Sequence, residues 1–149
     1  MSKKTFRGRV VIAGEVSGKA TVSRQPFNTT GSYLTNMFAG NTSDAPCTDS
    51  GNEELFGKDL SGVILCTPTT VGSTMGGMTL MGMKALGVGL EALLFSKPID
   101  TLAAAGVLMA EIWKDQKIVT VDMLGDEFLE TVQTGDPITI HEDGTVEVG

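Results

Sequence analysis

Three short apolar runs alternate with two helical segments between residues 62 and 121. The runs cover 62–66, 92–95 and 117–121, and turn-forming residues bound them, which is typical of strands in a sheet covered on both faces. Residues 73–86 carry apolar side chains at helical spacing, and 100–113 form a second helical segment that Asp100 can cap. This order of strand, helix, strand, helix and strand predicts a central α/β layer.

The two ends of the chain indicate further strands. Residues 6–24 alternate apolar and polar side chains with glycine breaks, which predicts a β-hairpin. Near the C-terminus, 137–141 and 145–148 flank the pair Asp143 and Gly144, and an Asp-Gly pair between strands is a strong hairpin signal. We therefore expect a β-rich layer, built from both ends, to join the central layer.

The length of the chain favours one domain. A chain of 149 residues can bury a single core and is too short for two, so we expect one domain over residues 1–149. Within it, residues 28–57 are rich in Thr, Gly, Ser, Asn and Asp and show no sustained periodicity. A polar loop of this length inside a compact domain is usually functional or disordered.

Charge and hydropathy exclude two classes of protein. The formal net charge is −7, and the chain has three arginines, Arg7, Arg9 and Arg24, which argues against a general nucleic-acid binder. No apolar run reaches the length of a membrane-spanning helix, and residues 1–5 lead into the alternating segment without the apolar core of a signal peptide. We therefore expect a cytoplasmic protein that binds neither nucleic acid nor membrane.

The residues that commonly bind metals are few. Cys47 and Cys66 are expected to be free thiols, and with the single histidine, His141, they cannot complete a structural zinc site or hold a metal cluster without help. Cys66 ends a buried run and should behave as a small hydrophobic residue, whereas Cys47 lies in the polar loop and should be exposed. We expect His141 to be a surface residue or a residue with satisfied hydrogen bonds, and not a catalyst.

The stretch from Cys66 to Gly77 is the most informative one for chemistry. A strand leads into the turn Gly72-Ser73-Thr74 and then into a helix, so hydroxyls and backbone N–H groups gather where anions bind. Ser73 is either a helix cap or a functional residue, and its surroundings leave both open. The stretch is not a Walker loop, a dinucleotide-binding fingerprint or a nucleophile elbow, because the required glycines and lysine are missing.

Read in order, these pieces resemble the small-subunit or swivelling-domain family of aconitase X, the divergent dehydratases of the aconitase superfamily. The resemblance covers nearly the whole chain. It rests on the Gly72-Ser73-Thr74 turn and on four further segments, residues 9–14, 18–23, 55–65 and 99–111. Residues 24–32 depart from the pattern of the family, which commonly has a Ser-Phe segment and a Gly-Gly-acidic turn there.

The resemblance implies a swivelling β/β/α domain that closes over a larger subunit. That partner would hold an iron–sulfur cluster, and the pair would remove water from a hydroxy acid. By the same resemblance Ser73 is the catalytic base or proton carrier, and Gly72 and Thr74 help to bind the substrate carboxylate. Arg24 is a further candidate for substrate binding. A non-catalytic binding or assembly domain of the same fold is the alternative.

Two substrates fit the resemblance, namely cis-3-hydroxy-L-proline and mevalonate 5-phosphate. A phosphate would draw basic groups into the domain, yet little beyond Arg24 and Lys19 is available. The polar loop instead contains acidic residues, which suit a cationic ring nitrogen better than a phosphate. The sequence therefore favours the hydroxyproline over the alternative, mevalonate 5-phosphate. The acidic residues are Asp44, Asp49, Glu53 and Glu54.

Overall fold

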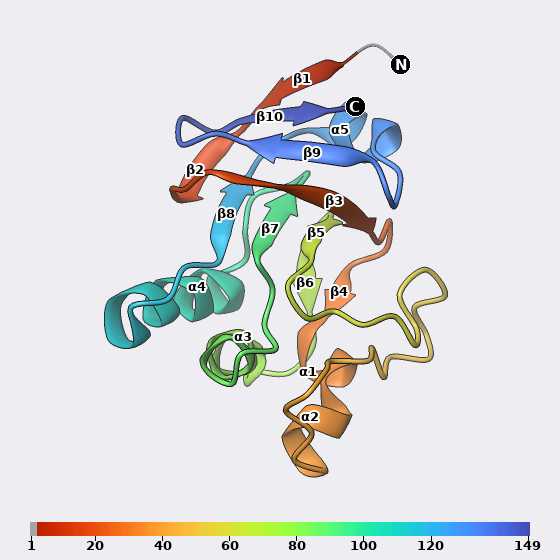
Figure 1. Ribbon diagram of the computed structural model, residues 1–149, viewed down its shortest axis with the longest axis vertical. Helices are drawn as coiled ribbons and strands as arrows, with labels where there is room; N and C mark the ends of the chain where they lie inside the picture. Colours follow the sequence, from red (N-terminus) through yellow and green to blue (C-terminus); the bar gives the residue numbers. More distant parts are fainter. Residues whose placement is uncertain (1–2) are drawn as a thin grey trace.

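The computed structural model describes residues 3–149. Met1 and Ser2 lie outside the described residues, and they belong to the segment 1–5 in which we expect no signal peptide. A mixed sheet dominates the described part of the chain (Figure 1). Its strands are β1 (Lys4–Arg7), β2 (Arg9–Ile12), β3 (Val16–Val22), β5 (Ile64–Thr67), β7 (Ala92–Phe95), β8 (Val119–Asp122), β9 (Pro137–Ile140) and β10 (Thr145–Val148). The helices and the smaller sheet are α1 (Thr29–Ser32), α2 (Leu34–Phe38), α3 (Gly76–Ala85), α4 (Thr101–Lys114), α5 (Asp126–Thr131), β4 (Phe27–Asn28) and β6 (Thr70–Val71).

The large sheet is nearly closed. Its strand order is β1-β10-β9-β3-β5-β7-β8-β2, so β1 and β2, which follow each other in sequence, lie at its two edges. Gly8 joins them, and a Cβ atom at this position would lie 2.3 Å from the carbonyl oxygen of Asp122. The chain therefore passes from one edge of the sheet to the other where only glycine fits.

The prediction of an N-terminal hairpin was wrong. Strand β2 pairs antiparallel with β8, while β3 pairs antiparallel with β9 and parallel with β5. The alternation of residues 6–24 identified strands correctly, but alternation does not specify partners, which here come from distant parts of the chain.

The predicted central layer is confirmed. Strands β3, β5, β7 and β8 are mutually parallel, and the last three are buried along their whole length. Asp100 caps α4 as expected, because its side chain accepts a hydrogen bond from the Ala103 N–H at 3.0 Å. The C-terminal hairpin of β9 and β10 is confirmed as well. Helix α5 had not been predicted.

The core lies on both faces of the sheet. On one face Leu65 and Leu93 pack with Leu80 of α3 and Val107 of α4. On the other face Cys66, Leu94 and similar side chains pack with Phe128 of α5 and with β9 and β10. None of the helices between residues 3 and 149 is long and apolar enough to span a bilayer.

Residues 28–57 are more structured than their composition suggests. They contain α1 and α2, and they bury Tyr33, Leu55 and Cys47 in the main core. The expectation that Cys47 is exposed was therefore wrong, since its relative exposure is 2%. A few apolar side chains spaced irregularly along a polar segment anchor it without producing a periodic signal.

His141 follows β9 and is held between two carboxylates. Its Nε2 lies 2.7 Å from Glu147 Oε2, and its Nδ1 lies 3.7 Å from Glu15 Oε1. The hydrogen bond with Glu147 raises the pKa of His141 above its ordinary 6.5 and lowers the pKa of Glu147 below its ordinary 4.5. Protonated His141 therefore stabilises the folded chain most below pH 6.5, and this stabilisation is lost as the pH rises through its folded-state pKa. Ionised Glu147 stabilises the folded chain most above pH 4.5, and this stabilisation is lost as the pH falls through its folded-state pKa.

We expect His141→Gln to lower the melting temperature more at about pH 5.5 than at about pH 9, because only a protonated imidazole forms the ion pair with Glu147. Thermal unfolding followed by circular dichroism in buffers of equal ionic strength measures this difference. A loss of the same size at both pH values would show that the histidine contributes by packing alone.

Candidate functional site

A cavity of about 320 Å³ opens beside the turn that carries Ser73. The turn connects β6 to α3, and the cavity also reaches the N-terminus of α4, so three elements meet at it. Parallel strands bring the loops that follow them to one edge of the sheet, which is why segments 30 residues apart in sequence share the cavity. The lining residues are Thr70, Val71, Gly72, Ser73, Gly76, Asp100, Thr101 and Leu102.

Ser73 is exposed and is not a helix cap. Helix α3 begins at Gly76 with Met75 as its N-cap residue, so the serine lies in the turn before the helix. Its Oγ accepts a hydrogen bond from the Met75 N–H at 3.2 Å. The hydroxyl of Thr30 in α1 lies 3.1 Å away, and either hydroxyl can be the donor in that pair. Ser73 Oγ thus has two partners and still faces solvent.

Gly72 has a steric reason to be glycine. Its φ of +119° is rarely adopted by other residues, and a Cβ atom would lie 2.6 Å from Asn28 Oδ1. Asn28 in turn caps α1 by accepting a hydrogen bond from the Gly31 N–H at 2.9 Å. The close contact between Gly72 and Asn28 therefore holds the Ser73 turn against the start of α1.

Asp100 is the one titratable group among the residues that line this cavity. The Thr70 hydroxyl donates to Oδ1, and the Ala103 N–H donates to Oδ2. Both carboxylate oxygens are engaged, so Asp100 fixes the geometry of β6 against α4. No lysine or arginine lines the cavity in the described part of the chain.

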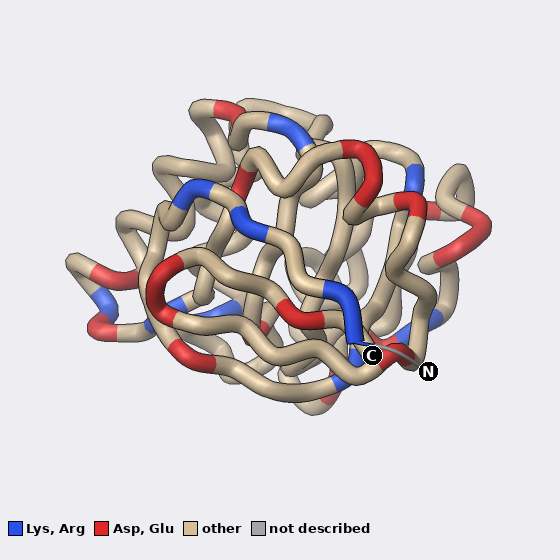
Figure 2. The backbone as a smooth tube through the Cα atoms, turned by 90° about the horizontal axis from the view of Figure 1, so that it is seen from above, with Lys and Arg blue, Asp and Glu red and all other residues tan. Residues whose placement is uncertain are grey.

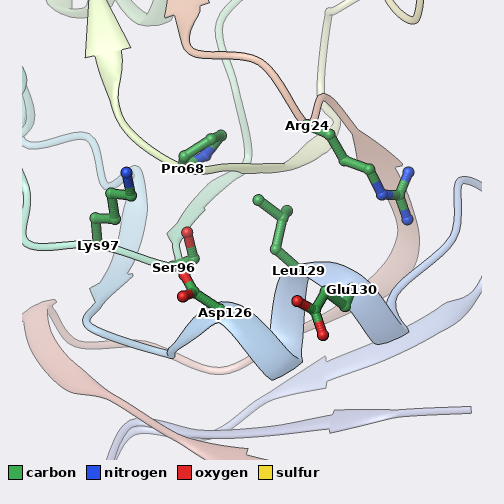
Figure 3. Close-up of a pocket in the computed structure, with 7 residues that line it drawn as sticks. All are labelled: Arg24, Pro68, Ser96, Lys97, Asp126, Leu129 and Glu130. Carbon is green, nitrogen blue, oxygen red and sulfur yellow. The ribbon is translucent and has the colours of Figure 1, made fainter.

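The structure separates Arg24 from the Ser73 turn. Its backbone N–H and its Nη1 donate to the Glu54 carboxylate at 2.6 and 3.1 Å, and its Nη2 donates to the Val132 carbonyl at 2.6 Å. It lines a second cavity of about 290 Å³, with Lys97 on the opposite side of that cavity (Figure 3). The remaining lining residues are Pro68, Ser96, Asp126, Leu129 and Glu130. Thr74 is exposed beside Ser73 but does not line the first cavity.

The acidic residues of the 28–57 segment do not line the Ser73 cavity either. Glu54 is paired with Arg24, Asp44 accepts from the Asn41 side chain, and Asp49 accepts from the Gly51 N–H. These carboxylates are therefore not placed to bind a cationic substrate in the Ser73 cavity.

Between residues 3 and 149 no three His, Cys, Asp or Glu side chains come close enough together to hold a metal ion. Cys47 and Cys66 are both buried, and they lie in different hydrophobic clusters on opposite faces of the sheet. Burial raises the pKa of the Cys66 thiol far above its usual range. The two thiols therefore do not fit a shared iron–sulfur cluster.

Charged residues are missing from the segments that meet around Ser73. Residues 25–43, 60–83 and 101–110 contain no Asp, Glu, Lys or Arg, although 19% of the chain is charged. Large apolar side chains are exposed on the same segments, among them Val71 and Met78. At the end of the molecule that carries the termini, by contrast, charges of both signs are interspersed (Figure 2).

Comparison with known proteins gives one consistent result. The family model described as Aconitase X swivel domain matches residues 5–148. The chain is 29% identical to the phosphomevalonate dehydratase small subunit of Archaeoglobus fulgidus, over 96% of this chain and 97% of that one. It is also 29% identical to the protein of the same name from Aeropyrum pernix, over 96% and 92% of the two chains.

The fold is shared with a solved structure. The crystal structure of Thermococcus kodakaraensis aconitase X in its holo form superimposes with a TM-score of 0.81 and 23% identity, covering 98% of both chains. The expected swivelling domain, with its β-rich layer and its central sheet covered by helices, is thereby confirmed as a fold.

Proposed function

Because this chain belongs to the aconitase X swivel domain family, we propose that it is the small subunit of a two-chain dehydratase in which Ser73 is the base. The observation that carries this proposal is the exposed Ser73 hydroxyl, which has two hydrogen-bond partners at the mouth of a cavity. A hydroxyl held in this way is placed to exchange a proton with a bound substrate, which supports a catalytic role over a purely binding one.

In the proposed reaction Ser73 Oγ, in its deprotonated alkoxide form, takes a proton from the carbon next to the substrate carboxylate. The C–H bond breaks, an O–H bond forms on the serine, and the electron pair left on carbon becomes a double bond as the hydroxyl leaves from the neighbouring carbon. An iron–sulfur cluster in the large subunit would act as the Lewis acid for that hydroxyl. Gly72 and the backbone of the turn let the substrate carboxylate approach Ser73, and Thr74 flanks it.

For the substrate we favour mevalonate 5-phosphate over cis-3-hydroxy-L-proline. Both reported relatives are named phosphomevalonate dehydratase small subunits, and the acidic residues that favoured the hydroxyproline lie away from the cavity. No lysine or arginine between residues 3 and 149 lines the cavity, so the large subunit is expected to supply the cations for a phosphate.

Assays of the reconstituted pair with both compounds test this choice. We expect turnover of mevalonate 5-phosphate and none of cis-3-hydroxy-L-proline. The opposite pattern would overturn the proposed substrate and leave the dehydratase itself standing, whereas no turnover of either compound by an intact, cluster-loaded pair would count against the reaction.

The large subunit is proposed to cover the uncharged segments around Ser73. The centres of protein interfaces are depleted in charged residues and enriched in methionine, as these segments are. The partner must also reach Ser73, because its metal and the serine act on neighbouring carbons. We therefore expect its contact face to be apolar and uncharged around the cluster.

We expect Met78→Glu to weaken assembly by about tenfold or more, since it would bury an unpaired charge in the interface. Met78 lies in the first turn of α3 and is 62% exposed. Leu86→Glu is the matched control, because Leu86 is 49% exposed at the other end of the same helix. Titration of the large subunit by analytical ultracentrifugation gives both affinities, and equal affinities for the two variants would place the interface elsewhere.

A further inference from the structure

Thr30 provides a side-chain contact to Ser73 from a distant part of the chain. The two hydroxyl oxygens are 3.1 Å apart, although 43 positions separate the residues in sequence. Among residues 3–149 Thr30 is the one side chain that hydrogen-bonds to Ser73 Oγ, and the other partner of that oxygen is the Met75 backbone N–H. Thr30 is half-buried, so the protein limits its movement.

The fold delivers Thr30 to this place through a short pair of strands. Strand β4 runs parallel to β6, with Phe27 opposite Thr70 and Asn28 opposite Val71. Asn28 then caps α1 and lies against Gly72, so that the first turn of α1 is held next to the Ser73 turn. The ring of Phe27 is fully buried and packs edge-on against Tyr33, with ring centroids 6.2 Å apart.

The chemistry of the serine determines the direction of this hydrogen bond. A neutral serine can donate or accept, but a serine that has lost its proton can only accept. Thr30 must then be the donor, and the Met75 N–H is a second donor to the same oxygen. Hydrogen bonds to a charged oxygen are shorter and stronger than those between neutral groups.

We propose that Thr30 is a positioning residue for Ser73, because its hydroxyl donates to the serine oxygen and stabilises the alkoxide that accepts the substrate proton. This inference rests on the proposed function of Ser73 as the base. The threonine keeps its own proton throughout. The proton that Ser73 takes from carbon passes to water after the product has left and before the next turnover.

The test uses the assembled pair with Thr30→Val, which keeps the shape of the side chain and removes the hydroxyl. We expect kcat to fall by about tenfold to a hundredfold, at or below the lower end of the cost of removing one donor from an oxyanion hole, because the Met75 N–H still donates to Ser73 Oγ. KM should stay within about twofold, and the rising limb of the pH-rate profile should move to higher pH. Thr30→Ser keeps the hydroxyl, so it should retain most of the rate, and the rising limb of its pH-rate profile should stay at the original pH.

Two results would overturn the inference. One is a Thr30→Val pair with the kcat and pH-rate profile of the unchanged protein, and the other is a Thr30→Ser pair as impaired as Thr30→Val. Thr30→Ala replaces Thr30→Val if the latter does not assemble, with the same expected loss. Ser73→Ala measured in parallel separates this test from the proposed function, because a fully active Ser73→Ala pair contradicts the base itself.

Discussion

We expect the replacement of Ser73 by alanine to abolish dehydration by the assembled pair and to leave the pair assembled. Positioned proton transfer contributes typically 10²–10⁴-fold, so we expect kcat to fall by at least about a hundredfold. The structural cost is small, because the side chain gives up its bonds to the Met75 N–H and to Thr30, a loss of about 0.5–1.5 kcal/mol for each bond. Initial rates of the pair, with assembly checked by gel filtration, measure the effect.

Ser17→Ala is the control for this experiment. Ser17 is an exposed serine on β3 whose hydroxyl bonds Thr139 Oγ1 at 3.3 Å, away from the cavity. Its loss should leave the rate unchanged. A Ser73→Ala pair that keeps more than about a tenth of the original rate would show that the serine only shapes the turn.

Gly106→Ala should destabilise the chain by about 3 kcal/mol or more, near the upper end of what one extra methyl group costs in a packed interior. A Cβ atom at Gly106 would lie 2.5 Å from the carbonyl oxygen of Gly77, so α4 and α3 would have to separate. Because α3 begins at the Ser73 turn, we expect the separation to disturb the site as well.

Gly82→Ala adds the same methyl group in α3, but we expect it to raise the free energy of unfolding. Nothing lies within 4 Å of a Cβ atom at Gly82, and alanine is favoured over glycine in a helix by about 0.5–1 kcal/mol. Urea unfolding of the two variants gives both free energies. If both variants lost stability equally, the close packing of α3 on α4 could not be the cause.

Local patterns were sufficient to predict the central layer. The run 92–95 coincides with β7, and Asp100 caps α4, because both features depend on residues close together in sequence. The C-terminal hairpin was predictable for the same reason, since its Asp-Gly turn lies between its two strands. The family resemblance added the swivelling fold, which the aconitase X structure bears out.

Long-range pairing could not be read from the sequence. Strand β2 pairs with β8, and β3 pairs with β9 and β5, all of them distant in sequence. The short β4–β6 pair has no sequence pattern that would predict it. Thr30 was missed because only the β4–β6 pair and the Asn28 cap bring it to Ser73. Asp100 was recognised as a cap but not as a residue of the cavity, although the parallel order of β5 and β7 could have indicated it.

Complementation decides whether this chain completes a two-chain dehydratase. A tagged copy isolates its large partner from the native host, and the separated partner is then titrated with the purified chain while mevalonate 5-phosphate consumption is followed. We expect no turnover by either protein alone and a rate that rises and saturates as the chain is added. Turnover by this chain alone, or a partner that is equally active without it, would contradict the proposal.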